Sequence, residues 1–110
     1  MKLTKYNIED YNETIIEDMK SETEEELVKK AIKSNISLER VILSSANLQG
    51  INFKKTNLKD AYLNGSDIRD ADLSEANIKG ISLLRCHIGN TIINRNQVEY
   101  VLKGLGFVNK

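Results

Sequence analysis

The chain has 110 residues, and its sixteen basic and sixteen acidic side chains cancel to a formal net charge of zero. This length suits one domain, and the balanced charge argues against direct binding to nucleic acid. The single cysteine excludes an internal disulfide framework and favours a reducing, cytoplasmic location. We expect neither a signal peptide nor a membrane span, because the chain starts MKLTKYNIED and contains no apolar run long enough to cross a bilayer.

Residues 1–35 carry apolar residues at helical spacing and predict an N-terminal helical cap. The first helix is indicated by Ile8, Tyr11, Ile15 and Met19. Ser21 followed by Glu24 resembles a capping box, and it predicts the start of a second helix that ends near Asn35. The apolar stripe of that helix consists of Leu27, Val28, Ala31 and Ile32.

Residues 36–95 repeat with a period of five, and each unit is centred on an apolar residue. The centres are Leu38, Leu43, Leu48, Phe53, Leu58, Leu63, Ile68, Leu73, Ile78, Leu83, Ile88 and Ile93. A second apolar or small residue lies two positions before each centre, so both side chains of an extended segment can face inward. The three remaining positions are mostly polar and must form the outer side and a turn. Such a period predicts a solenoid with an apolar interior.

The last segment, residues 96–110, predicts a C-terminal capping helix and tail. Asn94 is the expected N-cap, with Gln97 at the N3 position and Gly104 as a stop. The helical spacing is carried by Val98, Val101, Leu102 and Leu105. Phe107 and Val108 follow, and we expect them to lie under the cap or to meet a second subunit.

The units ANLQG, TNLKD, ADLSE and ANIKG closely match the motif A-[D/N]-L-x-x, and the chain therefore resembles the pentapeptide-repeat family. The resemblance implies an all-β solenoid, a right-handed quadrilateral β-helix with four units per coil. Twelve units then make about three coils, and we expect helical caps at both ends. The resemblance also implies a homodimer contact through the C-terminal cap.

With four units per coil, residues twenty apart stack on one side of the solenoid. This register predicts charge pairs such as Arg40 over Asp60 and Glu39 over Lys59. Most charges then have an opposite neighbour, which makes them a solvated surface rather than a binding site.

One acidic cluster stands out: Asp67, Asp70, Asp72 and Glu75. Some proteins of the resembled family mimic duplex DNA and occupy the DNA site of a topoisomerase such as gyrase, and others inhibit nucleic-acid-guided defence complexes of the kind that phages face. The whole solenoid is not acidic enough for such a role, but this corner is a candidate patch. Against it, Asp67 and Asp72 occupy the position where Asp or Asn makes a local turn hydrogen bond.

One face carries three outward apolar side chains, those of Ile42, Tyr62 and Leu84. They form a candidate contact with a protein partner of unknown identity. The alternative is that the first helix covers this face with Tyr11, Ile15 and Met19.

The sequence offers no catalytic, cofactor-binding or metal-binding set, and we expect a non-enzymatic interaction protein without a cofactor. His87 is the single histidine, and Cys86 occupies an inward position typical of a small core residue.

Overall fold

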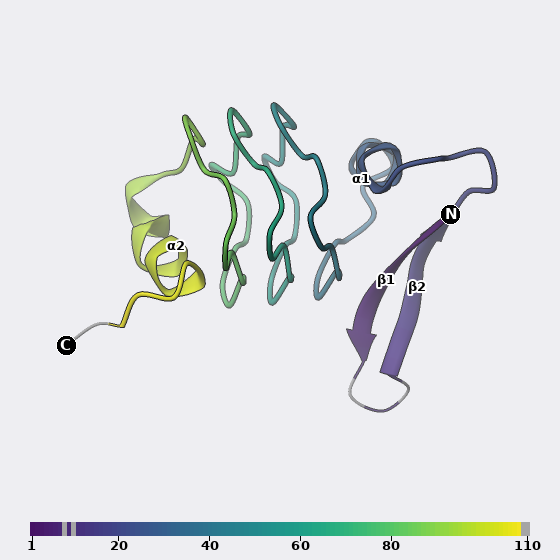
Figure 1. The fold of residues 1–110 in the computed structure, drawn as a ribbon, viewed down its shortest axis with the longest axis horizontal. Helices are drawn as coiled ribbons and strands as arrows, with labels where there is room; N and C mark the ends of the chain where they lie inside the picture. Colours follow the sequence, from purple (N-terminus) through teal and green to yellow (C-terminus); the bar gives the residue numbers. More distant parts are fainter. Residues whose placement is uncertain (8, 10, 109–110) are drawn as a thin grey trace.

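The computed structural model describes residues 1–7, 9 and 11–108, in which a hairpin and a helix precede a solenoid that a short helix closes (Figure 1). The elements are β1 (Lys2–Asn7), β2 (Tyr11–Glu17), α1 (Glu24–Lys33), the 3-10 turn η1 (Arg95–Gln97) and α2 (Val98–Gly104).

The prediction of a first helix before residue 20 is wrong, because β1 and β2 form an antiparallel hairpin there. The hairpin extends the first coil: the Tyr6 N–H donates to the Arg40 carbonyl at 3.0 Å, and the Ile42 N–H donates to the Thr4 carbonyl at 2.9 Å. An open solenoid end exposes unpaired backbone groups, and an extended segment satisfies them where a helix has no free groups to offer. The N-terminal cap is therefore a hairpin plus one helix. Of the residues assigned to the first helix, Ile8 lies outside the described part of the chain.

Helix α1 has the predicted apolar stripe, with Leu27, Val28 and Ala31 fully buried. Its N-cap is Thr23, whose hydroxyl accepts from the Glu26 N–H at 3.2 Å. The predicted cap, Ser21, is buried and instead donates its hydroxyl to Asp18 at 3.2 Å. The predicted start was therefore two residues too early.

The repeat region is a solenoid in which the chain pairs with itself twenty residues further on. Parallel bridges join Ile42 to Tyr62 and Tyr62 to Ser82, and three more columns follow the same step. Backbone hydrogen bonds accompany them, such as that from the Leu63 N–H to the Ser82 carbonyl at 3.0 Å. One circuit therefore takes four five-residue units, as the column register predicts.

The unit centres fill the solenoid interior as the period predicts, with Leu38 through Leu83 at 2% exposure or less. The last two centres are exceptions, with Ile88 at 42% exposure and Ile93 half-buried, because they lie in the last circuit and no further coil covers them. The residue two positions after each centre from Leu38 to Ile88 has a left-handed backbone, from Arg40 (φ 59°) to Asn90 (φ 59°). These left-handed corners turn the chain once per unit.

At the C-terminal end, Gln97 is buried and bonds to the last circuit. Its amide donates to the carbonyls of Leu73 (2.8 Å) and Ala76 (2.9 Å), and its side-chain oxygen accepts from the Asn94 N–H at 2.7 Å. Helix α2 then packs on the solenoid through Gly104, whose carbonyl accepts from the Leu83 N–H at 2.8 Å. The two apolar tail residues before position 109 do not tuck under this cap: Phe107 is 65% and Val108 85% exposed. The final tail residues, 109–110, lie outside the described part of the chain.

Candidate functional site

The predicted apolar face is present on the outside of the solenoid. Ile42 and Tyr62 are bridge partners on adjacent circuits. Leu84 follows Ser82 by two residues, and Ser82 is the bridge partner of Tyr62 on the next circuit. Tyr62 is 42% and Leu84 41% exposed, and Ile42 is half-buried. The exposure of Tyr62 and Leu84 agrees with the outward positions that the period predicts.

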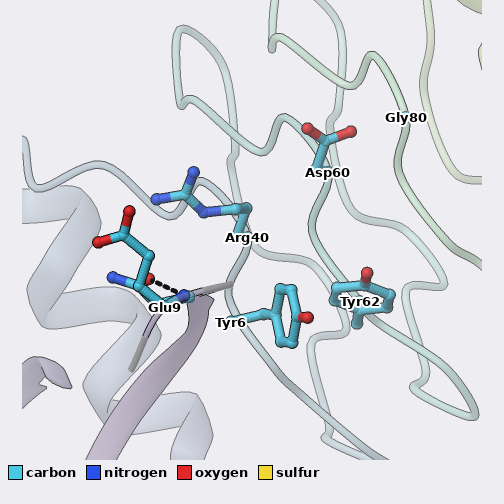
Figure 2. Close-up of a pocket in the computed structure, with 7 residues that line it drawn as sticks. Tyr6, Glu9, Arg40, Asp60, Tyr62 and Gly80 are labelled. Carbon is cyan, nitrogen blue, oxygen red and sulfur yellow. Dashed lines mark hydrogen bonds between the residues drawn. The ribbon is translucent and has the colours of Figure 1, made fainter. Parts of the chain in front are cut away.

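The N-terminal segment borders this face and does not lie over it as a helix. Strand β1 pairs antiparallel with the first coil through Lys5 and Val41, and this places Tyr6 beside the face. Tyr6 is 42% exposed, and Figure 2 shows its ring next to that of Tyr62. The alternative of a covering helix is therefore wrong: β2 spans Tyr11–Glu17, Ile15 is half-buried and Met19 is almost fully exposed.

A pocket of about 570 Å³ opens between the hairpin and the coils (Figure 2). Its lining includes Tyr6, Glu9, Arg40, Asp60, Tyr62 and Gly80. Sequence reasoning placed Arg40 over Asp60 as a charge pair, but no ion pair within 4.0 Å joins them among the described residues. The Asp60 carboxylate instead lies over Gly80, in the space that a Cβ there would need.

A second pocket of about 670 Å³ continues the first one toward α2, because both are lined by Asp60 and Gly80. It adds Leu84, Tyr100 and three lysines, Lys59, Lys79 and Lys103. We call the two pockets together the axial groove. It runs from the hairpin to the C-terminal helix and borders the apolar face through Tyr62 and Leu84.

Sequence reasoning missed Tyr6 and Arg40 as members of this surface. The signal for the strand was present in β-branched Thr14, Ile15 and Ile16, which favour extended structure. That signal identifies a strand, but it does not say which coil edge the strand joins.

The acidic cluster divides into two kinds of position. Asp67 and Asp72 accept the predicted turn hydrogen bonds, from the Arg69 N–H at 3.1 Å and the Ser74 N–H at 2.9 Å. Asp70 and Glu75 are exposed at left-handed corners, with φ of 61° and 64°.

The first pair of carboxylates is also neutralised by neighbouring cations. Asp67 pairs with the Arg69 guanidinium at 2.6 Å, and Asp72 lies 3.7 Å from the Lys54 ammonium. The hydrogen bond from Arg69 lowers the pKa of Asp67, and the hydroxyl of Ser74 does the same for the pKa of Asp72. This corner therefore displays less free negative charge than its sequence suggests.

The other reactive side chains are separate from one another. Cys86 is half-buried and its thiol donates to the Leu63 carbonyl at 3.0 Å, while burial raises the thiol pKa. His87 is exposed on the outer wall. Over the described ranges, no three His, Cys, Asp or Glu side chains converge on a metal-sized site, and neither helix has the length and apolar character needed to cross a membrane.

Comparison with known proteins agrees with this geometry. The family model described as pentapeptide repeats matches residues 32–60 and 42–80, with eight copies. A search of curated proteins found no match to the chain. The match covers the same units whose centres fill the solenoid interior.

Proposed function

Because the chain belongs to the pentapeptide-repeat family, we propose that it is a non-enzymatic interaction module that binds a partner protein through the face of Ile42, Tyr62 and Leu84. The family points to protein binding in general. The choice of face is our own inference from the exposed side chains.

One observation carries this proposal: Tyr62 and Leu84 stay more than 40% exposed on the outer wall of the solenoid, where the other outward positions of residues 36–95 are polar or small except for Ile42 and Ile92. Tyrosines are enriched in protein interfaces, since an aromatic ring buries a large area at low entropic cost. Tyr6 extends the surface from a neighbouring strand. Tyr6, Ile42 and Tyr62 come from neighbouring segments, and exposed apolar side chains of this kind support an interaction site.

Further features of the fold and assembly belong to the same proposal. We infer that the twelve units form three right-handed coils, that the protein acts in the cytoplasm, and that two copies pair through the C-terminal cap. The pairing is supported by Ile88, Phe107 and Val108, which expose apolar surface at that end.

The second candidate function is an inhibitor or protector that occupies the DNA site of an enzyme through Asp67, Asp70, Asp72 and Glu75. Duplex DNA carries one charge per about 1.7 Å of axis, so a mimic needs closely spaced unpaired carboxylates. Among the described residues, the ion pairs of Asp67 and Asp72 leave two of the four carboxylates without a cation partner. We therefore favour the apolar face.

The change Tyr62→Glu tests the proposal. Replacing an interface tyrosine by a charge should weaken partner binding about tenfold or more, because the carboxylate must be desolvated against apolar surface. Tyr62 points outward, so the thermal unfolding midpoint should stay close to that of the wild type. Affinity capture from host lysate measures binding of the partner, and light scattering measures self-association.

The control is Ile92→Glu, which places the same charge at the equivalent outward position of another column. This variant should retain the captured partner. Equal capture by the Tyr62→Glu variant and the wild type would contradict the proposed face.

A further inference from the structure

Arg40 occupies the point where the hairpin meets the first coil, and its backbone is held from both sides. Its carbonyl accepts from the Tyr6 N–H at 3.0 Å, and its own N–H donates to the Lys59 carbonyl at 2.8 Å. Its φ of 59° makes it one of the left-handed corners. The base of the side chain is therefore fixed beside the pocket of Figure 2.

One donor of the Arg40 guanidinium, its buried Nε atom, makes no hydrogen bond among the residues that the structure describes. Two carboxylates line the same pocket, those of Glu9 and Asp60, yet neither lies within ion-pair distance among the described residues. A buried donor without an acceptor is unfavourable, and with no carboxylate paired to it within the described chain, the guanidinium is open to an acceptor that enters the pocket.

The surroundings of Arg40 suit a planar acceptor carried by a protein. The guanidinium presents its N–H groups as a fork that matches the two oxygens of a carboxylate. Tyr6 and Tyr62 line the pocket beside it, each with an exposed ring and a hydroxyl (Figure 2). Arginine and tyrosine together are the residue types that dominate binding hot spots.

We propose that Arg40 is the anchor for an acidic side chain of the partner protein, whose neighbouring apolar residue lies on Ile42, Tyr62 and Leu84. This inference rests on the proposed function, because it names the chemistry that the same face selects. The bound carboxylate accepts from the Arg40 guanidinium in the pocket that Tyr6 and Tyr62 also line.

The charges of the axial groove favour a protein segment over a nucleic acid. Four cations line the groove, but three carboxylates alternate with them: Glu9, Asp60 and Glu99. A phosphate chain would meet those carboxylates, whereas a protein segment of mixed charge can match both signs.

Selection from a phage library of random twelve-residue peptides on the immobilised full chain tests this proposal. We expect the wild type to enrich sequences with Asp or Glu next to an apolar residue. An enriched peptide should bind the Arg40→Gln variant about tenfold more weakly, and Arg40→Glu should shift the selection toward Lys or Arg. The matched control is Arg85→Gln, which removes the same charge from another left-handed corner (φ 60°) outside the groove. Circular dichroism checks that all variants stay folded.

The outcomes separate the two proposals. Suppose the selected peptides no longer bind the Tyr62→Glu variant, but they show no preference for Asp or Glu or bind the Arg40→Gln variant as tightly as the wild type. That result would contradict the role of Arg40 as an anchor and leave the proposed face intact. No enrichment by the wild type over the Tyr62→Glu variant would overturn both. Binding of a fluorescent dT12 oligonucleotide that is lost in Arg40→Gln would also overturn the anchor, in favour of nucleic acid.

Discussion

Six corners of the solenoid combine a left-handed residue with a local hydrogen bond that holds the turn. A left-handed backbone costs a residue with a Cβ roughly 1–2 kcal/mol. In these six units an Asn or Asp three positions before the corner accepts from the backbone N–H two residues further on, as Asn52 does from Lys54 at 2.9 Å. This bond fixes the turn independently of the side chain at the corner. The corners therefore tolerate Arg40, Asp60 and Gly80 in one column.

At the residue scale, the lowered pKa values of Asp67 and Asp72 predict how the stability of the fold changes in acid. Their hydrogen bonds lower both pKa values in the folded chain, so the carboxylates stabilise it above the unfolded pKa of about 4. That contribution is lost as the pH falls through the lowered folded pKa. The double variant Asp67→Asn, Asp72→Asn keeps the turn acceptors but cannot titrate, and its unfolding midpoint should fall less between pH 5 and pH 2. Thermal unfolding followed by circular dichroism measures this slope.

The control for the pH experiment is Asp70→Asn, at a corner where the carboxylate makes no ion pair among the described residues. Its slope should match that of the wild type. The assignment is wrong if the double variant and the wild type lose stability in parallel.

At the scale of elements, the two ends of the solenoid are closed by different means. The first coil receives a strand, which continues its backbone pairing through Tyr6 and Ile42. The last circuit receives a side chain, because the Gln97 amide donates to the Ala76 carbonyl, which no further coil can reach, and adds a second donor to the Leu73 carbonyl. Both solutions satisfy backbone groups that an open end would leave unpaired.

Replacing Gln97 tests this closure. Gln97→Ala should lower the free energy of unfolding by about 2–4 kcal/mol, since it removes a buried side chain, one of the two donors to the Leu73 carbonyl and the side-chain donor to the Ala76 carbonyl. Gln97→Glu should destabilise most at neutral pH, where the carboxylate faces two carbonyl oxygens, and should recover in acid once it is protonated and can donate. Urea unfolding at pH 7 and pH 4 compares the two variants.

The matched control is Asn96→Ala, an exposed neighbour in the same 3-10 turn, which should change stability little. A Gln97→Glu variant that is equally stable at both pH values would contradict the role of the donor.

The same elements explain how far the sequence predicts the fold and the site. The period of five states directly which side chains face inward, so the core and the outward positions of Tyr62 and Leu84 follow from it. The hairpin does not, because Ile15 and Met19 fall at helical spacing by chance and only pairing with Arg40 and Ile42 decides for the strand. Tyr6 and Arg40 meet through that long-range pairing, and no local pattern encodes it.

At the scale of the whole molecule, the fold is stabilised by hydrogen bonds between successive circuits. The molecule measures 44 × 32 × 22 Å, and each circuit bonds only to its neighbours along the axis. A central circuit therefore has pairing on both sides, whereas an end circuit depends on its cap. Repeat proteins of this kind open from their ends.

This arrangement predicts graded amide hydrogen exchange. The N–H groups of Leu58, Leu63 and Ile68 should exchange slowest, because their acceptors lie in the following circuit, which must separate from the central one to expose them. Those of Tyr6 and Phe107 should exchange fastest, since only a cap must open. Exchange followed by NMR measures the gradient, and equal protection of all five amides would show instead that the chain opens in one step.

The pairing of residues twenty apart has a consequence for how such a chain can change length. An insertion of five residues preserves every inward and outward position, so the core would survive it. Yet it would turn all later units by one side of the solenoid and carry Tyr62 away from Tyr6 and Arg40. The sequence therefore has two periods. The period of five residues maintains the core, and the period of twenty residues maintains the face. Between the hairpin and Tyr62, duplication of a five-residue unit can lengthen the solenoid without disrupting its core. Only an insertion of whole twenty-residue circuits would keep Tyr62 on the same side of the solenoid as Tyr6 and Arg40.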